Sequence, residues 1–271
     1  MRLTQRVHSV FRRYGVVGVI RATGRRLFRQ HARLTKDLLP LVTGRQGLEI
    51  GGPSPIFERT GLLPVYPAAG SLDNANFSAT TIWQGAGAES DAFIFDRKKQ
   101  PGRQMIAEAS NLPAIPDGSY DFLLASHALE HLANPIKALH EWHRVLRPSG
   151  ALLIVLPDGA ATFDHKRPVT PLAHMIEDFN RRVGEDDETH FAEVLALHDL
   201  ARDPDAGGRA RFEDRVRRNL EFRSVHHHVF NESNAAALVE HAGFTVLRHE
   251  RASPHHLIVL GQKTVGYNRP Q

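Results

Sequence analysis

The segment from residue 117 to 158 constrains the fold of this chain more than any other part of the sequence. Residues 120–125 form a nearly unbroken apolar run, which is typical of a strand buried on both faces of a parallel sheet. Asn134 and Pro135 then mark the start of an amphipathic helix, and a Pro-Ser-Gly sequence marks its end. A second apolar strand is predicted at 151–156. The segment therefore predicts a βαβ unit with a right-handed crossover.

Polar residues follow the first strand of this unit directly. They are Ser126, His127, Glu130 and His131. In open α/β sheets, ligands bind outside the carboxyl ends of the strands. We therefore expect a ligand site at this edge.

The rest of the chain extends the same α/β pattern. Strands or extended segments are predicted at 47–50, 63–73, 104–107, 244–248 and 256–261, and a helix is predicted at 231–241. A short Ser253-Pro254 turn joins the last two strands and favours an antiparallel hairpin. Between them and the βαβ unit lies a polar insertion, expected to be helical at 171–182 and 190–200. The predicted fold class is α/β: a doubly wound, mostly parallel sheet with an antiparallel C-terminal hairpin, plus the polar insertion.

The first 40 residues differ from the rest in charge. The first 38 contain ten cationic residues against one acid, Asp37, with apolar residues at roughly helical intervals. A basic helical arm of residues 1–40 is predicted. It either packs on the domain or makes peripheral contact with an anionic membrane. An organelle transit peptide also has this composition, and nucleic acid is not an expected partner.

Composition excludes several classes of protein. The chain of 271 residues has no cysteine, so it has neither disulfides nor thiolate metal sites. No apolar run of about 18 residues is present, and the apolar stretch at 14–20 is too short for a secretory signal. A cytoplasmic location is expected, with membrane association through the arm as the alternative.

The loop after the first predicted strand contains Gly51 and Gly52. Two glycines allow backbone N–H groups to approach a ligand closely. The loop reads GGPSP, which departs from the GxGxxG pattern of dinucleotide-binding proteins.

Four motifs, in this order along the chain, resemble those of the class I, Rossmann-like S-adenosylmethionine-dependent methyltransferases, in the broad group that includes quinone-biosynthesis methyltransferases. They lie at 49–52, 108–113, 119–132 and 141–150. The resemblance covers about residues 47–158 together with the final helix and hairpin. It implies a cofactor-binding core at 41–158, an acceptor-side insertion or lid at 159–223, and a C-terminal part at 224–271 that completes the core.

The resemblance also implies roles for individual residues. Glu49 and Gly51 would line the methionine end of the cofactor, with Gly52 allowing close approach. Asp73, 22 residues after Gly51, would take the ribose hydroxyls. The remaining cofactor contacts would be Glu108 to the adenine amino group, the Ala109 backbone to a ring nitrogen, and Ser126 with His127 beside the sulfonium.

Methyl transfer is a direct displacement, so such an enzyme mainly aligns the acceptor with an activated methyl group. An oxygen or nitrogen acceptor also needs a base near neutral pH, and histidine suits this role. His127 is the first candidate for the catalytic base and His131 the second.

Further candidates lie in and after the insertion. His226 and His228, within a run of three histidines, share one face of an extended segment and are predicted to contact the acceptor. The run also has the ligand type for zinc or iron, but a pocket wall is favoured and no metal is expected. Asp164 and Arg167 either bind a polar acceptor or pair with one another to order the insertion.

These patterns together predict an S-adenosylmethionine-dependent methyltransferase acting on oxygen of a small polar or glycan-type acceptor. Two alternatives remain. One is a catalytically silent protein of the same fold that binds the cofactor, and the other is a different Rossmann-type enzyme that uses a nicotinamide cofactor.

Overall fold

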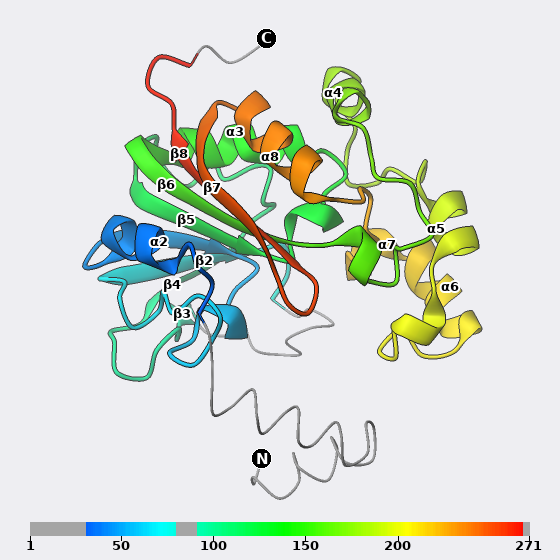
Figure 1. Cartoon of the computed structure of the whole chain (residues 1–271), viewed down its shortest axis with the longest axis horizontal. Helices are drawn as coiled ribbons and strands as arrows, with labels where there is room; N and C mark the ends of the chain where they lie inside the picture. The colour runs from blue at the N-terminus through cyan, green and yellow to red at the C-terminus, as the bar shows by residue number, and fades with distance from the viewer. Residues whose placement is uncertain (1–30, 80–90, 268–271) are drawn as a thin grey trace, which may run out of the picture.

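The computed structural model describes residues 31–79 and 91–267, and an eight-stranded sheet forms its centre (Figure 1). The strand order is β3-β4-β2-β1-β5-β6-β8-β7. The strands are β1 (Gln46–Ile50), β2 (Ser71–Asn76), β3 (Ala92–Phe93), β4 (Gly102–Ile106), β5 (Tyr120–Ser126), β6 (Leu146–Pro157), β7 (Phe244–Ala252) and β8 (His256–Lys263).

The centre of the sheet is parallel and its ends are antiparallel. β1 pairs with β2 and β5, and β4 and β6 extend the parallel set on either side. β8 pairs antiparallel with β6 and β7, which gives the C-terminal hairpin. The predicted fold class is therefore confirmed. The strand order reverses between β1 and β5, the position at which open α/β sheets bind ligands.

The βαβ unit forms as its sequence predicts. Helix α3 (Pro135–Val145) begins after Asn134, whose Oδ1 accepts a hydrogen bond of 3.0 Å from the Lys137 N–H. Trp142 is fully buried, and its Nε1 donates to the Ala109 carbonyl at 2.9 Å. Because Ala109 follows β4, this bond fixes α3 against the loop that carries the second predicted cofactor motif.

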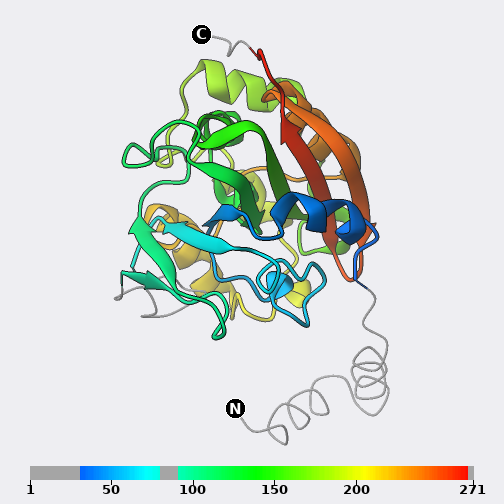
Figure 2. The same ribbon diagram turned by 90° about the vertical axis from the view of Figure 1, so that its left-hand side faces the viewer.

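Helices cover both faces of the sheet, as Figures 1 and 2 show. Alternate residues of β5 divide between two apolar cores. Leu123 packs with α3 and with α8 (Glu232–His241), whereas Leu124 packs with α2 (Thr35–Val42). A strand buried on both faces has no polar face, which explains the unbroken apolar run in the sequence.

The extended segment predicted at 63–73 is largely wrong as a strand. Only its last three residues belong to β2, which begins at Ser71. The preceding stretch is irregular and follows the short 3₁₀ turn η1 (Pro55–Phe57), yet Leu63, Val65 and Tyr66 are buried under the sheet. Prolines within this stretch remove backbone donors, so it fills the core without joining a ladder.

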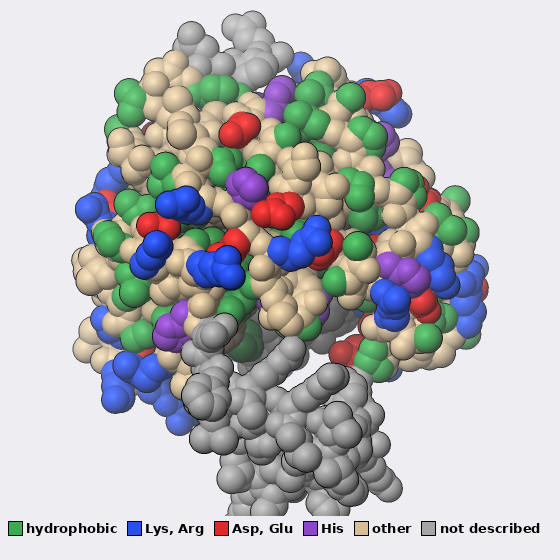
Figure 3. All heavy atoms as spheres, viewed as in Figure 1, with side chains coloured by type: hydrophobic (Ala, Val, Ile, Leu, Met, Phe, Trp, Pro, Cys, Tyr) green, Lys and Arg blue, Asp and Glu red, His purple; other side chains and the backbone are tan. Residues whose placement is uncertain are grey.

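The insertion, residues 159–223, contains four α-helices among the described residues. They are α4 (Leu172–Asn180), α5 (Phe191–Leu197), α6 (Arg209–Arg217) and α7 (Asn219–Phe222). The two predicted helices are confirmed with shorter bounds, whereas α6 and α7 were not predicted. α5, α6 and α7 lie together beside the sheet (Figure 1). A small apolar core forms between α5, α6 and Val225. Basic and acidic side chains are interspersed over the face seen in Figure 3.

The N-terminal arm lies mostly outside the described residues, so its predicted helix and membrane contact stay predictions. The described part of the arm packs on the sheet through Leu34 and Leu38, and the boundary predicted at residue 40 falls inside α2. Among the described residues, no helix has the length and apolar character needed to cross a membrane.

Candidate active site

A cavity of about 520 Å³ lies at the carboxyl ends of the parallel strands, where the strand order reverses. Its size is in the range of small-molecule and cofactor sites. Its walls come from the residues that follow β1, β2, β4 and β5, from the end of β6, and from the end of the insertion. They include Ile50, Gly51, Asn76, Phe77, Glu108, Ala109, Ser126, His127, Glu130, His131, Pro157, Arg223, His226 and His255.

Glu49 supports the loop after β1 from behind and does not line the cavity. Its side chain is fully buried, and its Oε1 accepts from the Ser54 N–H at 3.1 Å. The Tyr66 hydroxyl lies 2.8 and 3.0 Å from the two carboxylate oxygens. Burial raises the pKa of Glu49 to about 8, against hydrogen bonds that act to lower it. The structure therefore makes Glu49 a positioning residue for the loop.

The two glycines of this loop have different functions. Gly51 lines the cavity with a φ of +77°, a conformation that other residues rarely adopt. Gly52 packs against Glu49, since an added Cβ would lie 2.3 Å from its Cδ atom. The Gly52 N–H donates to Asn74 Oδ1 at 2.9 Å, and Asn74 Nδ2 donates back to the Gly52 carbonyl at 3.1 Å. The loop is thus held from both sides.

Asp73 does not occupy the position predicted for it. It lies inside β2, and its Oδ2 accepts from Arg103 at 2.9 Å and from the Tyr120 hydroxyl at 2.8 Å. β2 continues for three more residues, so its carboxyl end is Asn76, which lines the cavity. The ribose-binding role predicted for Asp73 therefore does not fit its place in the structure, because the strand extends beyond it.

Glu108 and Ala109 line the cavity as predicted, and Arg223 joins them from the end of the insertion. Arg223 donates to Glu108 Oε1 at 2.6 Å and to Glu185 Oε2 at 2.6 Å, and its guanidinium lies 5.3 Å from the centre of the Phe77 ring. Glu108 Oε2 is buried and has no hydrogen-bond partner within residues 31–79 and 91–267. A buried acceptor of this kind needs a donor, which a ligand in the cavity can supply.

His127 lies at the end of β5, beside Ser126, with a φ of 51°. Its Nδ1 is 3.4 Å from Glu130 Oε1, and its Nε2 is 3.0 Å from His256 Nδ1. Burial acts to raise the pKa of Glu130, but the neighbouring histidines, His127 first, outweigh it and lower this pKa. Burial lowers the pKa of His256 to about 3. The Glu130 carboxylate thus orients the His127 ring, and the His256 ring on the other side of His127 is neutral.

His131 and His226 form the second histidine group of the cavity wall. The His131 Nδ1 donates to the Val225 carbonyl at 3.1 Å, and burial lowers the pKa of His131 to about 4. His226 donates from Nδ1 to Asp164 Oδ2 at 2.6 Å. Burial acts to lower the pKa of His226, but the Asp164 charge outweighs it and raises this pKa. His226 is therefore oriented by a carboxylate in the same way as His127.

Three residues predicted to contact the acceptor lie behind the cavity wall. Asp164 and Arg167 pair at 2.9 Å, which is the second of the two alternatives predicted for them. Arg167 also donates to the His226 carbonyl at 2.8 Å, so the pair fixes the segment that carries His226. His228 is fully buried and its Nε2 lies 3.1 Å from Asp178 Oδ2. None of the three is among the lining residues.

Several residues at the site were not predicted. They are Tyr66, Asn74, Asn76, Phe77, Arg223, His255 and His256. The end of β2 would have indicated Asn76 and Phe77 if that strand had been placed correctly. The others reach the site through tertiary contacts between segments distant in sequence, for which no local motif exists.

The family comparison identifies part of the chain. Residues 85–154 match the family described as "Methyltransferase domain". This segment therefore resembles a methyltransferase domain. The predicted resemblance to the methyltransferases is thereby confirmed for this segment. The match includes Glu108, Ala109, Ser126 and His127 and therefore contains much of the cavity wall.

Solved structures similar to this one include further methyltransferases. A SAM-dependent methyltransferase from Methanosarcina mazei is 15% identical, with 87% of this chain and 99% of that chain covered and a TM-score of 0.49. The 1,6-didemethyltoxoflavin-N1-methyltransferase of Burkholderia thailandensis is 15% identical, with 97% and 92% covered and a TM-score of 0.47. A comparison with curated protein sequences gives no match.

Proposed function

We propose that the methyltransferase domain transfers the methyl group of S-adenosylmethionine to an oxygen atom of a small polar acceptor, with glycan-type acceptors as the first class to test. One observation carries this proposal. A single cavity joins a buried carboxylate oxygen that needs a donor, Glu108 Oε2, to the carboxylate-oriented histidines His127 and His226. The Glu108 oxygen suits a cofactor with an adenine amino group, and the two histidines suit a hydroxyl that must lose a proton.

The lining residues fit the cofactor. Glu108 Oε2 would accept from the adenine amino group, and the Ala109 backbone would meet the ring. Asn76, at the end of β2, would take the ribose hydroxyls in place of Asp73, and Gly51 would adjoin the methionine part. When bound, S-adenosylmethionine supplies a methyl group already activated by the sulfonium.

The acceptor side would be formed by His127, His131 and His226. We assign the base to His127, because it lies at the end of β5 and the Glu130 carboxylate orients it. A proton taken by the ring would form an imidazolium next to Glu130, which stabilises it. Direct displacement needs little more than this base, alignment of the acceptor and exclusion of water.

Two alternative functions differ in measurable ways. A nicotinamide enzyme would bind a dinucleotide, although the GGPSP loop lacks the glycine pattern that accommodates a pyrophosphate. A silent binding protein would bind S-adenosylmethionine without transferring its methyl group. Titration of the full chain with both cofactors separates the first alternative from the proposal.

The test of transfer uses S-adenosylmethionine with a labelled methyl group. The acceptor panel contains monosaccharides, lipid-linked glycans, other small hydroxyl compounds and amines. The proposal expects the label on a hydroxyl oxygen, and expects the His127→Asn variant to lose it while Glu240→Ala, on the exposed face of α8, keeps it. Transfer only to nitrogen would overturn the oxygen assignment. Cofactor binding without transfer to any acceptor would favour the silent protein.

A further inference from the structure

Another group of histidines lies outside the cavity, where the insertion meets the segment that leads into α8. It consists of His174, Asp178, His190 and His228, called here the His-Asp cluster. His174 and Asp178 are one turn apart on α4 and so share a face of that helix. His190 directly precedes α5, and His228 precedes α8. Three separate segments of the chain therefore converge on one point.

The ligand atoms of the cluster have the spacing of a metal site. His174 Nε2 lies 3.0 Å from His190 Nε2 and 3.4 Å from Asp178 Oδ2. His228 Nε2 lies 3.1 Å from the same Asp178 oxygen, and all four ligand atoms lie within 4.8 Å of one another. Four ligands around a zinc ion at 2.0–2.1 Å would be about 3.3 Å apart in a tetrahedron. The cluster thus approximates that arrangement.

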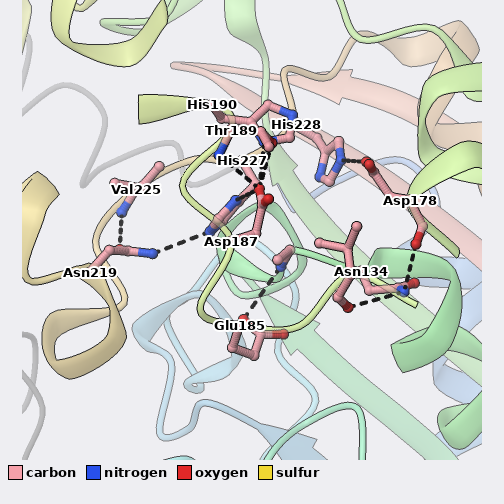
Figure 4. A network of polar contacts seen from close by, with 12 residues as sticks. Asn134, Asp178, Glu185, Asp187, Thr189, His190, Asn219, Val225, His227 and His228 are labelled. Atoms are coloured by element: carbon pink, nitrogen blue, oxygen red, sulfur yellow. Dashed lines mark hydrogen bonds and ion pairs between the residues drawn. The ribbon is translucent and has the colours of Figure 1, made fainter. Parts of the chain in front are cut away.

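The surroundings of the cluster resemble the outer shell of a metal site. His190 presents Nε2 to the cluster, and its Nδ1 lies 3.3 Å from Asp187 Oδ2. Asp187 in turn accepts from the Thr189 hydroxyl at 2.7 Å. Metal-binding histidines commonly have a carboxylate on the nitrogen that faces away from the ion. Figure 4 shows His228 joined to Asp178, with Asp187 beside His190 and Thr189.

The cluster is enclosed on the side of the core. His228 is fully buried, and the Asp178 side chain is 5% exposed. The Asp178 carbonyl accepts from Asn134 Nδ2 at 3.3 Å, which ties α4 to the start of α3. His174, at 42% side-chain exposure, leaves a path from solvent. An ion can therefore enter past His174 and reach ligands that are already held in place.

We propose that the His-Asp cluster binds one zinc ion. Imidazole and carboxylate ligands suit Zn²⁺, and four protein ligands leave no open position, which is typical of a structural site rather than a catalytic one. The ion fastens α4 and the loop before α5 to residue 228. In a chain without cysteine, this is a cross-link that a disulfide cannot provide. Because His228 is two residues from His226, the ion also fixes the insertion relative to the acceptor side of the cavity.

The proposed zinc site is not formed by the run of three histidines at 226–228. The structure separates the three histidines: His226 bonds to Asp164, His227 to Asn219, and only His228 joins the cluster. The other ligands come from the insertion, so the run alone could not have indicated the site. The proposal is independent of the methyl acceptor and of cofactor binding.

The test uses the full chain without affinity-tag histidines, stripped with a chelator and then titrated with ZnCl₂. We expect one zinc ion per chain with a Kd below about 1 μM, and a higher Tm in the zinc-loaded form. Co²⁺ in the same site is expected to give the intense visible absorption of tetrahedral coordination. These measurements do not depend on methyl transfer, so failure here leaves the proposed function standing.

Two variants make the test specific. His174→Gln removes a half-exposed ligand, so the chain should still fold. We expect it to weaken zinc binding by more than about 100-fold. Loss of a residue that only supports a ligand typically weakens binding by about 10–100-fold. The matched control is His249→Gln, whose exposed ring pairs with Glu232 and does not belong to the cluster. Absence of zinc binding in the wild-type chain would overturn the proposal, as would equal affinity in His174→Gln and the wild type.

Discussion

Arg223 donates a hydrogen bond to Glu108 Oε1 at 2.6 Å, although 115 residues separate the two in the sequence. Glu108 follows β4, in the part of the chain that matches the methyltransferase domain, whereas Arg223 ends the insertion. The same guanidinium donates to Glu185 within the insertion at 2.6 Å. The insertion therefore contributes directly to the end of the cavity assigned to the adenine of the cofactor.

Replacing Arg223 by Gln should weaken S-adenosylhomocysteine binding roughly tenfold or more. The variant leaves Glu108 and the largely buried Glu185 without their cation. Truncating one partner of a fully buried charge pair costs about 2–5 kcal/mol, and the partial exposure of Glu108 places the expected loss at the low end of that range. Calorimetric titration measures the effect. Arg181→Gln, which removes an exposed and long ion pair of 3.9 Å, is the control and should bind normally. Unchanged affinity in the Arg223 variant would remove Arg223 from the cofactor site.

Gly52→Ala should destabilise the protein by about 1–3 kcal/mol, as overpacking of a dense site does. The added Cβ would meet the Glu49 side chain at 2.3 Å, and Glu49 is held by Tyr66 and Ser54. The loop must move, so cofactor affinity should fall together with Tm. Gly208→Ala adds a Cβ with no atom within 4 Å and should change neither quantity. A normal Tm for Gly52→Ala would mean that Glu49 moves aside easily.

His127→Asn should lower the rate of methyl transfer by about 10²–10⁴-fold, the usual contribution of a general base. Its affinity for S-adenosylmethionine should stay within about threefold of the wild type, because the proposed function of His127 concerns the acceptor. Rate and affinity are measured on the same preparation. His249→Asn serves as the control. A variant that keeps the full rate would show that another group takes the proton.

Glu49 should make stability decrease with increasing pH. Its pKa rises on folding from the ordinary 4.5 to about 8, so between these values the folded chain keeps a proton that the unfolded chain releases. The free energy of unfolding therefore falls as pH rises through this window, by at most about 1.4 kcal/mol per pH unit, and levels off above it. Glu49→Gln removes this dependence.

The measurement for Glu49 is the free energy of unfolding of the variant minus that of the wild type, from denaturant titrations at several pH values. The difference should increase in favour of the variant from pH 5 to 8, values that lie inside the window set by the raised pKa. Glu240→Gln, on an exposed position of α8, should give a flat difference. A flat difference for Glu49→Gln as well would show that Glu49 is ionised in the folded chain.

The sequence predicted those parts of the fold in which local and global signals agree. The βαβ unit combines a capped helix with two apolar strands, and each signal indicates the same arrangement. The stretch 63–70 contains the buried residues Leu63, Val65, Tyr66 and Ala69, but it does not form the hydrogen-bonded ladder of a strand. Its apolar pattern reflects burial and not strand pairing. Helix α6 was not predicted because it is rich in arginine, and its two buried residues, Phe212 and Val216, are too few to show an apolar helical pattern in the sequence.

The site could be predicted where strand ends determine it. Glu108, Ala109 and His127 follow strands that were placed correctly, Ser126 is the last residue of β5, and all four line the cavity. Asp73 was misplaced because its spacing from Gly51 does not say how far β2 continues. Residues such as Arg223, His255 and His256 reach the site only after the insertion and the hairpin fold over it, and no spacing along the chain encodes that approach.

The proposed function requires the cavity to bind S-adenosylmethionine through residues at the carboxyl ends of the parallel strands. Its most direct test is calorimetric titration of the full chain with S-adenosylhomocysteine, with NAD as the comparison ligand. We expect saturable binding of one S-adenosylhomocysteine per chain, weakened in Arg223→Gln and unchanged in Arg181→Gln, and no binding of NAD. Absence of S-adenosylhomocysteine binding at millimolar concentration, or tighter binding of NAD, would contradict it.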